Sequence, residues 1–117
     1  MAERERLICT ARELVETGKG IRFELDRYGQ LNKGFVVRYD GKPRAFLNQC
    51  GHVPVELDWQ EGEFFDDSRL YLICSTHGAL YHPGSGHCVG GRCAGRGLIP
   101  LSVVERDGHI YLIETVT

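Results

Sequence analysis

The sequence has no long apolar run and no block of charge of one sign. Its 14 Lys and Arg residues stand against 16 Asp and Glu residues, which gives a net charge of −2. The cations form no stripe that would match the phosphate backbone of a nucleic acid. No stretch is long enough to span a bilayer, and the charged residues 1–6 are unlike a secretory signal. These absences exclude nucleic-acid and membrane partners and predict a soluble, cytoplasmic protein.

Known catalytic fingerprints are also missing. The sequence holds no Rossmann glycine pattern, no phosphate-binding P-loop and no non-haem iron triad with a domain of its own. A chain of 117 residues forms one modest core, so a single domain over residues 1–117 is expected. The sequence therefore predicts a single-domain protein that is not itself an enzyme.

Helical periodicity is almost absent, and short apolar or alternating stretches take its place. Turn signals separate them about every ten residues, as in antiparallel all-β sandwiches and barrels. Asp40-Gly41 and Asp107-Gly108 favour tight hairpin turns. The strands expected from this pattern are 7–10, 21–25, 35–39, 44–47, 70–73, 103–105 and 110–113.

Residues 11–17 are the one stretch whose sequence predicts helical turns. Thr10 followed by Glu13 is a capping-box pattern, and Gly18 would end one or two turns. A plain polar loop is the alternative there.

Cysteine is scarce and odd in number, which fits a disulfide framework poorly. Two of the five cysteines belong to short Cys–His cassettes, Cys50-Gly51-His52 and Cys74-Ser75-Thr76-His77. Two Cys and two His can bind one zinc ion tetrahedrally, although the usual zinc finger places both histidines on a helix. They can also hold a binuclear iron–sulfur cluster, with thiolates on one iron and imidazoles on the other.

The two cassettes resemble the C-x-H and C-x-x-H-G motifs of the Rieske [2Fe–2S] family. The resemblance implies one cluster per chain, bound by Cys50 and Cys74 on the inner iron and by His52 and His77 on the outer iron. It also implies a Rieske-type antiparallel β-sandwich with a smaller cluster-binding subdomain of loops and short strands. That subdomain would comprise residues 46–98, with residues 1–45 and 99–117 as the β scaffold.

The sequence departs from the family pattern around these ligands. Ala79 replaces a serine that donates to a bridging sulfide in high-potential members, whereas Tyr81 keeps the place of a tyrosine that donates to a ligand sulfur. Arg92 follows Gly91 in the third loop, where proline is usual. The stretch 56–68 lengthens the gap between the cassettes and is expected to be a surface excursion, either a longer hairpin or a small flap.

The remaining cysteines carry no assigned ligand role. Cys9 is expected in the core, Cys88 as a small buried apolar residue and Cys93 as a free thiol in a Gly-rich loop. A second metal site that combines Cys88 and Cys93 with His82 and His87 matches no standard spacing.

The resemblance implies a small Rieske ferredoxin, an electron carrier between a flavin or iron–sulfur reductase and an oxygenase or another terminal enzyme. A redox-sensing or regulatory subunit of a larger complex is an alternative of another class. A zinc-stabilised binding module is the third.

Overall fold

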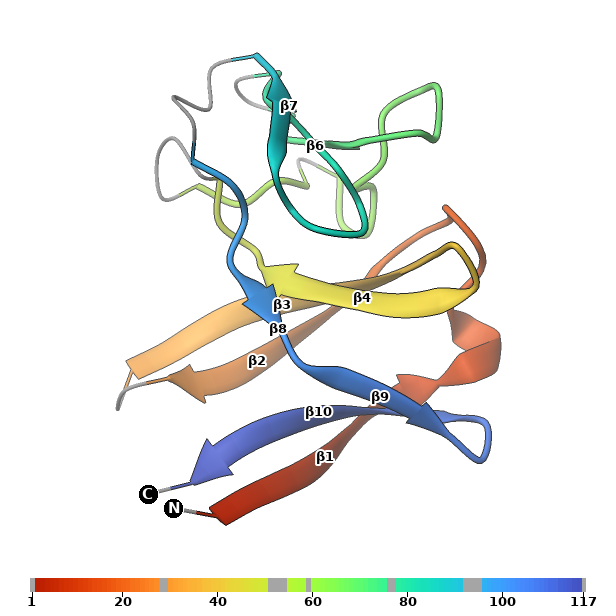
Figure 1. Cartoon of the computed structure of the whole chain (residues 1–117), viewed down its shortest axis with the longest axis vertical. Coiled ribbons are helices and arrows are strands. Elements are labelled where there is room, and N and C mark those ends of the chain that lie inside the picture. The colour runs from red at the N-terminus through yellow and green to blue at the C-terminus, as the bar shows by residue number, and fades with distance from the viewer. Residues whose placement is uncertain are drawn as a thin grey trace.

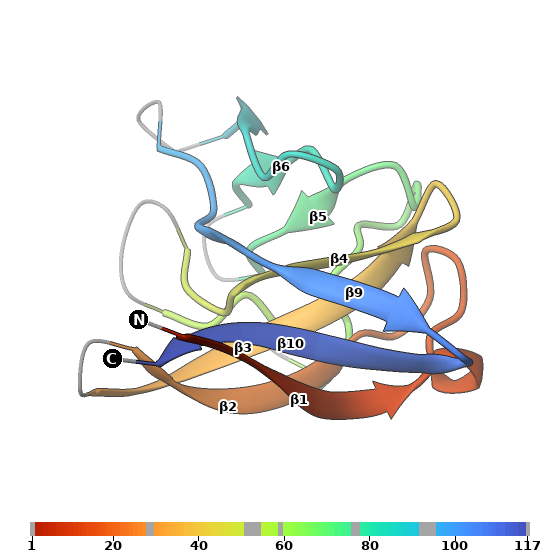
Figure 2. The ribbon, with the colours of Figure 1, turned by 60° about the horizontal axis from the view of Figure 1, so that its bottom comes forward.

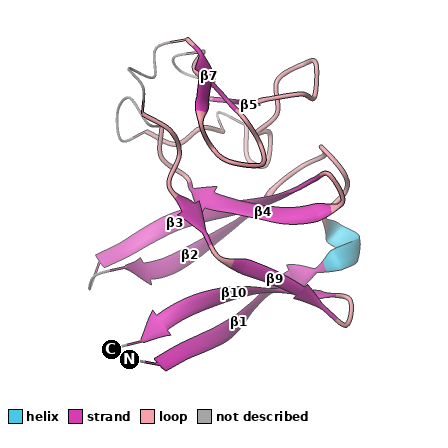
Figure 3. Ribbon diagram, viewed as in Figure 1, coloured by secondary structure: helices cyan, strands magenta, loops and turns pink. Residues whose placement is uncertain are grey.

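The computed structural model describes the backbone of residues 2–27, 30–50, 55–58, 60–75, 78–91 and 96–116. Within these ranges the chain forms antiparallel strands and one short 3-10 turn (Figure 3). The expected fold class, all-β and antiparallel, is confirmed.

The first sheet brings the two ends of the described chain together. It has the order β1-β10-β9, with β1 at Ala2–Thr10, β9 at Val103–Arg106 and β10 at His109–Val116. Strand β1 begins well before the expected residue 7. Charged side chains interrupt the apolar pattern there, so the sequence pattern does not predict the first part of the strand. Arg4 and Arg6 reach Glu114 on β10 at 3.2 and 3.0 Å, so these charges pair across the strands.

The second sheet has the order β2-β3-β4-β8. Its strands are β2 at Ile21–Arg27, β3 at Gln30–Tyr39, β4 at Lys42–Leu47 and β8 at Pro100–Leu101. The predicted hairpin turn between β3 and β4 is confirmed, since Asp40 and Gly41 have φ angles of 55° and 73°. Asp107 and Gly108 make the same turn between β9 and β10, with φ angles of 52° and 76°.

This second sheet is the middle layer of the molecule (Figure 1), and in the view of Figure 2 the first sheet lies in front of it. Residues on one face, among them Val36 and Ala45, pack with residues of the first sheet such as Ile110. Phe35 and Phe46 face the other way and pack among the residues of the loops above. Because both faces of this sheet are covered, its buried strands have continuous apolar runs instead of alternating apolar and polar residues.

A third, small sheet lies above the middle layer. It joins β5 at Leu72–Ile73, β6 at Leu80–Tyr81 and β7 at Cys88–Gly90 in that order. The strand expected over 70–73 is shorter than predicted. Leu70 is 61% exposed, because it belongs to the turn that precedes the strand.

The helix expected over 11–17 is reduced to η1, a single 3-10 turn at Ala11–Glu13. Its capping contacts are present, since the Thr10 backbone N–H and hydroxyl both donate to the Glu13 carboxylate at 2.8 and 3.0 Å. Leu14 is already extended and buried, so core packing ends the helix there.

The interpretation of residues 56–68 as a surface excursion is wrong for much of that stretch. Leu57 and Phe64 are fully buried and Phe65 is 7% exposed. Phe64 stacks on Phe35 of β3 with ring centroids 3.9 Å apart. The stretch therefore adds apolar surface to the core between the middle sheet and the loops. The part around the Phe65–Leu72 bridge forms a small hairpin.

Candidate metal centre

Two loops above the middle sheet present the cysteines of the two cassettes. Cys50 follows β4, is 3% exposed, and donates its backbone N–H to Val55 O at 2.8 Å. Cys74 follows β5, is fully buried, and donates its backbone N–H to Ala79 O at 2.9 Å. Both belong to the same core cluster, and neither is in a disulfide. The folded chain thus brings two thiols together on separate loops.

Tyr81 is the residue whose hydroxyl was expected, from the resemblance, to donate a hydrogen bond to a ligand sulfur. Its ring is fully buried, and its hydroxyl oxygen is 3.3 Å from Cys50 Sγ. When the sulfur is a thiolate, only the hydroxyl can donate in this pair. Tyr81 is therefore positioned to stabilise negative charge on Cys50.

Ala79 is also fully buried, and backbone from the third loop lies directly over it. Gly91 has a φ of 80°, and a Cβ there would come within 2.8 Å of the Ala79 Cα. The glycine is required both by its conformation and by this close approach. Because Ala79 has no hydroxyl, it offers no side-chain hydrogen bond to a neighbouring sulfur.

Several predicted site residues lie outside the described residues. These are His52, His77 and Arg92, and the expected thiol Cys93 lies outside them too. Their roles stay predictions.

The other cysteines divide into two kinds. Cys9 is in the core as expected, and burial raises the pKa of its thiol to about 11, with the nearby Glu13 carboxylate adding to the shift. Cys88 is disulfide-bonded, so the expectation of a plain apolar residue is wrong, although it packs against the same core as Cys50 and Cys74. Among the described residues, no three His, Cys, Asp or Glu side chains gather as a metal site.

Two buried polar residues at the base of the first loop were missed by sequence reasoning. Asn48 is 5% exposed and Asp58 is 7% exposed, and the Asn48 amide donates to the Asp58 carboxylate at 3.0 Å. Arg22 on β2 completes the group, with its Nε 3.6 Å from Asp58. The only signal in the sequence is an Asn and an Asp beside apolar residues, which is equally typical of a loop.

The chain matches the Rieske [2Fe–2S] domain family over residues 5–113. It belongs to this family and so carries one [2Fe–2S] cluster. The site fits that group, because Cys50 and Cys74 supply two buried thiols in one core and Tyr81 places a donor beside one of them.

Solved structures of the same fold include two ferredoxins. The ferredoxin of carbazole 1,9a-dioxygenase from Nocardioides aromaticivorans IC177 is 20% identical, with a TM-score of 0.67 over 92% of this chain and 95% of that one. The Sphingomonas yanoikuyae B1 ferredoxin is 17% identical, with a TM-score of 0.69 over 96% of this chain and 100% of that one.

The same fold also occurs as part of a larger chain. The terminal oxygenase of carbazole 1,9a-dioxygenase from Novosphingobium sp. KA1 is 22% identical, with a TM-score of 0.67 over 94% of this chain and 29% of that one. At such identities these likenesses show the fold alone. No curated protein matches the chain by sequence. Among the described residues, no helix is long and apolar enough to cross a bilayer.

Proposed function

We propose that the protein is a one-electron carrier of the Rieske ferredoxin type. Cys50 and Cys74 would bind the inner iron of the cluster, and His52 and His77 the outer iron. The observation that carries the proposal is the buried contact of 3.3 Å between the Tyr81 hydroxyl and Cys50 Sγ, in the core that also holds Cys74. The bound cluster supplies reversible one-electron chemistry, and the chain supplies the thiolates, the shielding core and the hydrogen bond.

The proposed partners are a reductase and an oxygenase or another terminal enzyme. Two solved relatives are named as ferredoxins, which supports this class of function. A cytoplasmic location is part of the same proposal, and cell fractionation tests it. Within the Rieske range of about −150 to +300 mV, we expect a low-to-intermediate potential. The reason is that Tyr81 supplies one donor while Ala79 lacks the other.

A potentiometric titration over a range of pH, followed by electron paramagnetic resonance (EPR), tests this function. We expect one electron per chain, because a [2Fe–2S] cluster cycles between two states. The midpoint should fall as pH rises, because an imidazole on the outer iron loses its remaining N–H more easily when the cluster is oxidised. A colourless protein that holds one zinc ion contradicts the proposal.

The Cys88 disulfide favours a second candidate, the redox-responsive subunit. Cys88 packs against the core that contains Cys50 and Cys74, so a change at this bond reaches the ligand region. Its reduction by a dithiol would take up two electrons and two protons and release two thiols. We predict Cys93 as the partner of Cys88, in place of the free thiol expected from the sequence, since Cys9, Cys50 and Cys74 are not in disulfides.

Thiol counting and voltammetry decide between the two candidates. Unfolded protein alkylated without reductant should carry three labels, and reduced protein five. A midpoint potential that changes after dithiol treatment in wild type, but not in Cys88→Ser/Cys93→Ser, supports the redox-responsive subunit. An unchanged midpoint in both supports the simple carrier.

A further inference from the structure

The two cysteine loops are joined through one buried residue, Leu57. Its backbone N–H donates to the Asn48 side-chain oxygen at 2.9 Å, and its carbonyl accepts from the Ser75 N–H at 3.0 Å. Asn48 lies two positions before Cys50, and Ser75 directly follows Cys74. A continuous chain of hydrogen bonds therefore runs from the base of one loop to the other.

The orientation of Asn48 depends on Asp58. The Asn48 side-chain N–H donates to one Asp58 oxygen at 3.0 Å, and the Gly62 backbone N–H donates to the other at 3.0 Å. A carboxylate only accepts, so the Asn48 amide nitrogen must face Asp58 and its oxygen must face Leu57. The reversed amide would leave Leu57 N–H and one Asp58 oxygen without hydrogen-bond partners in a buried place.

Asp58 is held in turn by a cation from the middle sheet. Its side chain has no exposed surface, and Arg22 Nε on β2 lies 3.6 Å away. Arg22 also pairs with Glu56 and Glu61, which lie on either side of Asp58 along the chain. The base of the first loop is thus anchored to the scaffold as well as to the second loop.

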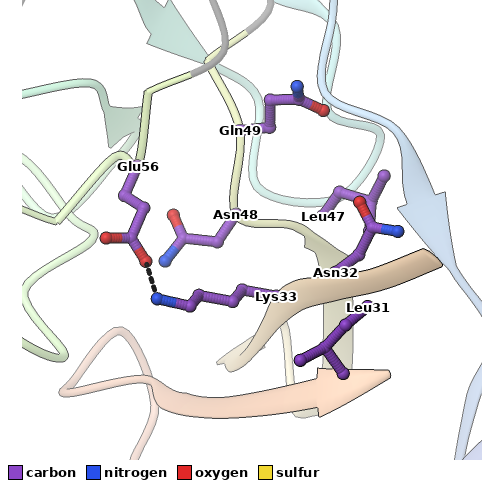
Figure 4. A pocket seen from close by; sticks show the side chains of 7 residues that line it. All are labelled: Leu31, Asn32, Lys33, Leu47, Asn48, Gln49 and Glu56. Atoms are coloured by element: carbon purple, nitrogen blue, oxygen red, sulfur yellow. Dashed lines mark ion pairs between the residues drawn. The ribbon is translucent and has the colours of Figure 1, made fainter. Parts of the chain in front are cut away.

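Figure 4 shows the same base from the side of a shallow pocket. The Asn48 amide points toward the ion pair of Lys33 and Glu56, whose charged atoms are 3.7 Å apart. The neighbouring Gln49 extends away from it and is exposed. The two adjacent amides therefore differ in role, and Gln49 offers a matched control.

We propose that Asn48 and Asp58 are positioning residues that set the separation of the two ligand loops. The inference rests on the proposed ligand set, because it assigns these residues to the geometry of Cys50 and Cys74. They act through Leu57 and Ser75. Substituting them should change the rate of cluster loss and the EPR g-values of the cluster, and not only the stability of the fold.

An exchange of the two residues gives a sharp test. In Asp58→Asn, one oxygen replaces the two that accept from Asn48 and Gly62. In Asn48→Asp, two carboxylates face one another. The double variant Asn48→Asp/Asp58→Asn restores the three hydrogen bonds of the pair and moves the charge away from Arg22: the carboxylate at position 48 accepts from Leu57 N–H and from the new amide, whose oxygen accepts from Gly62 N–H.

Cluster loss to a chelator, followed by visible absorption, and the EPR g-values of the reduced protein are the two readouts. We expect each single variant to lose the cluster about tenfold faster than wild type and to show shifted g-values, since each leaves a buried group unpaired. The double variant should return to within about threefold of wild type. Gln49→Ala should match wild type in both readouts.

Ile110→Val, in the core beneath the middle sheet, is the control for general destabilisation, and it should lower the unfolding temperature without shifting the g-values. Single variants that change only the unfolding temperature overturn the positioning role. A double variant no better than the single variants also overturns it. Wild-type protein that holds no cluster contradicts the proposed function instead, so the two failures are distinguishable.

Discussion

At the scale of single residues, burial gives cysteine different chemistry in different parts of this protein. Cys9 is surrounded by apolar residues of the sheet core, and burial holds its thiol in the neutral form. Cys50 is equally buried but has a hydroxyl 3.3 Å from its sulfur. A buried sulfur with a neighbouring donor can carry negative charge, whereas the Cys9 environment opposes it.

Tyr81→Phe should lower the midpoint potential. The lost hydroxyl offsets negative charge on Cys50, and that charge is greatest in the reduced state. If the hydrogen bond is stronger by about 1 kcal/mol in that state, the shift is roughly 40 mV. Protein-film voltammetry of wild type and variant measures it. An unchanged midpoint removes Tyr81 from the residues that tune the cluster and leaves it as a core aromatic.

Cys9 should react very slowly with alkylating agents in the folded protein. Its pKa is raised from 9.0 to about 11, so at pH 8 the thiolate is roughly a hundredfold rarer than in the unfolded chain. The raised pKa also adds stability that is present below pH 9 and is lost as pH rises toward 11. Mass spectrometry of the Cys9 peptide, with unfolded protein as the control, measures the rate. Equal rates would contradict the burial of this thiol.

At the scale of elements, sequence patterns predict what local chemistry determines. The Asp-Gly turns, the central hairpin and the two cysteine loops follow from residue types at fixed spacing. The length of β1 could not be predicted, because its charges pair with Glu114, a partner more than a hundred residues away. The Asn48–Asp58 pair was missed for the same reason: a buried polar pair is defined by the fold and not by neighbours in sequence.

The polar sequence around Phe64 wrongly suggests that this segment is exposed. Phe64 is fully buried and stacks on Phe35, although acidic residues surround it in the sequence. Phe64→Ala should therefore destabilise the protein by about 3–5 kcal/mol. Leu70→Ala, at a residue 61% exposed, is the control and should change stability by less than about 0.5 kcal/mol. Urea unfolding followed by circular dichroism compares them, and similar midpoints would restore the surface interpretation.

At the scale of the whole molecule, the middle sheet separates two hydrophobic cores that have different roles. Its lower face shares a core with the first sheet, where Ile110 and Leu112 are buried. Its upper face joins the core that contains both site cysteines. The lower core consists of strands paired over long registers, while the upper one is formed mostly by loops. Cluster binding is therefore expected to stabilise the two layers unequally.

Removal of iron should loosen the upper layer and leave the lower one protected. The N–H groups of Cys50, Cys74 and Gly78 make their hydrogen bonds within the ligand loops. When the metal no longer holds these loops, the exchange of the three N–H groups with solvent should become more than about tenfold faster. The Ile113 N–H on β10, which donates to the Ser102 carbonyl just before β9, should keep its protection. Hydrogen exchange of holo, apo and reconstituted protein by NMR measures both groups. Equal acceleration at Ile113 would mean that the two layers unfold as one cooperative unit and that the cluster stabilises the whole domain.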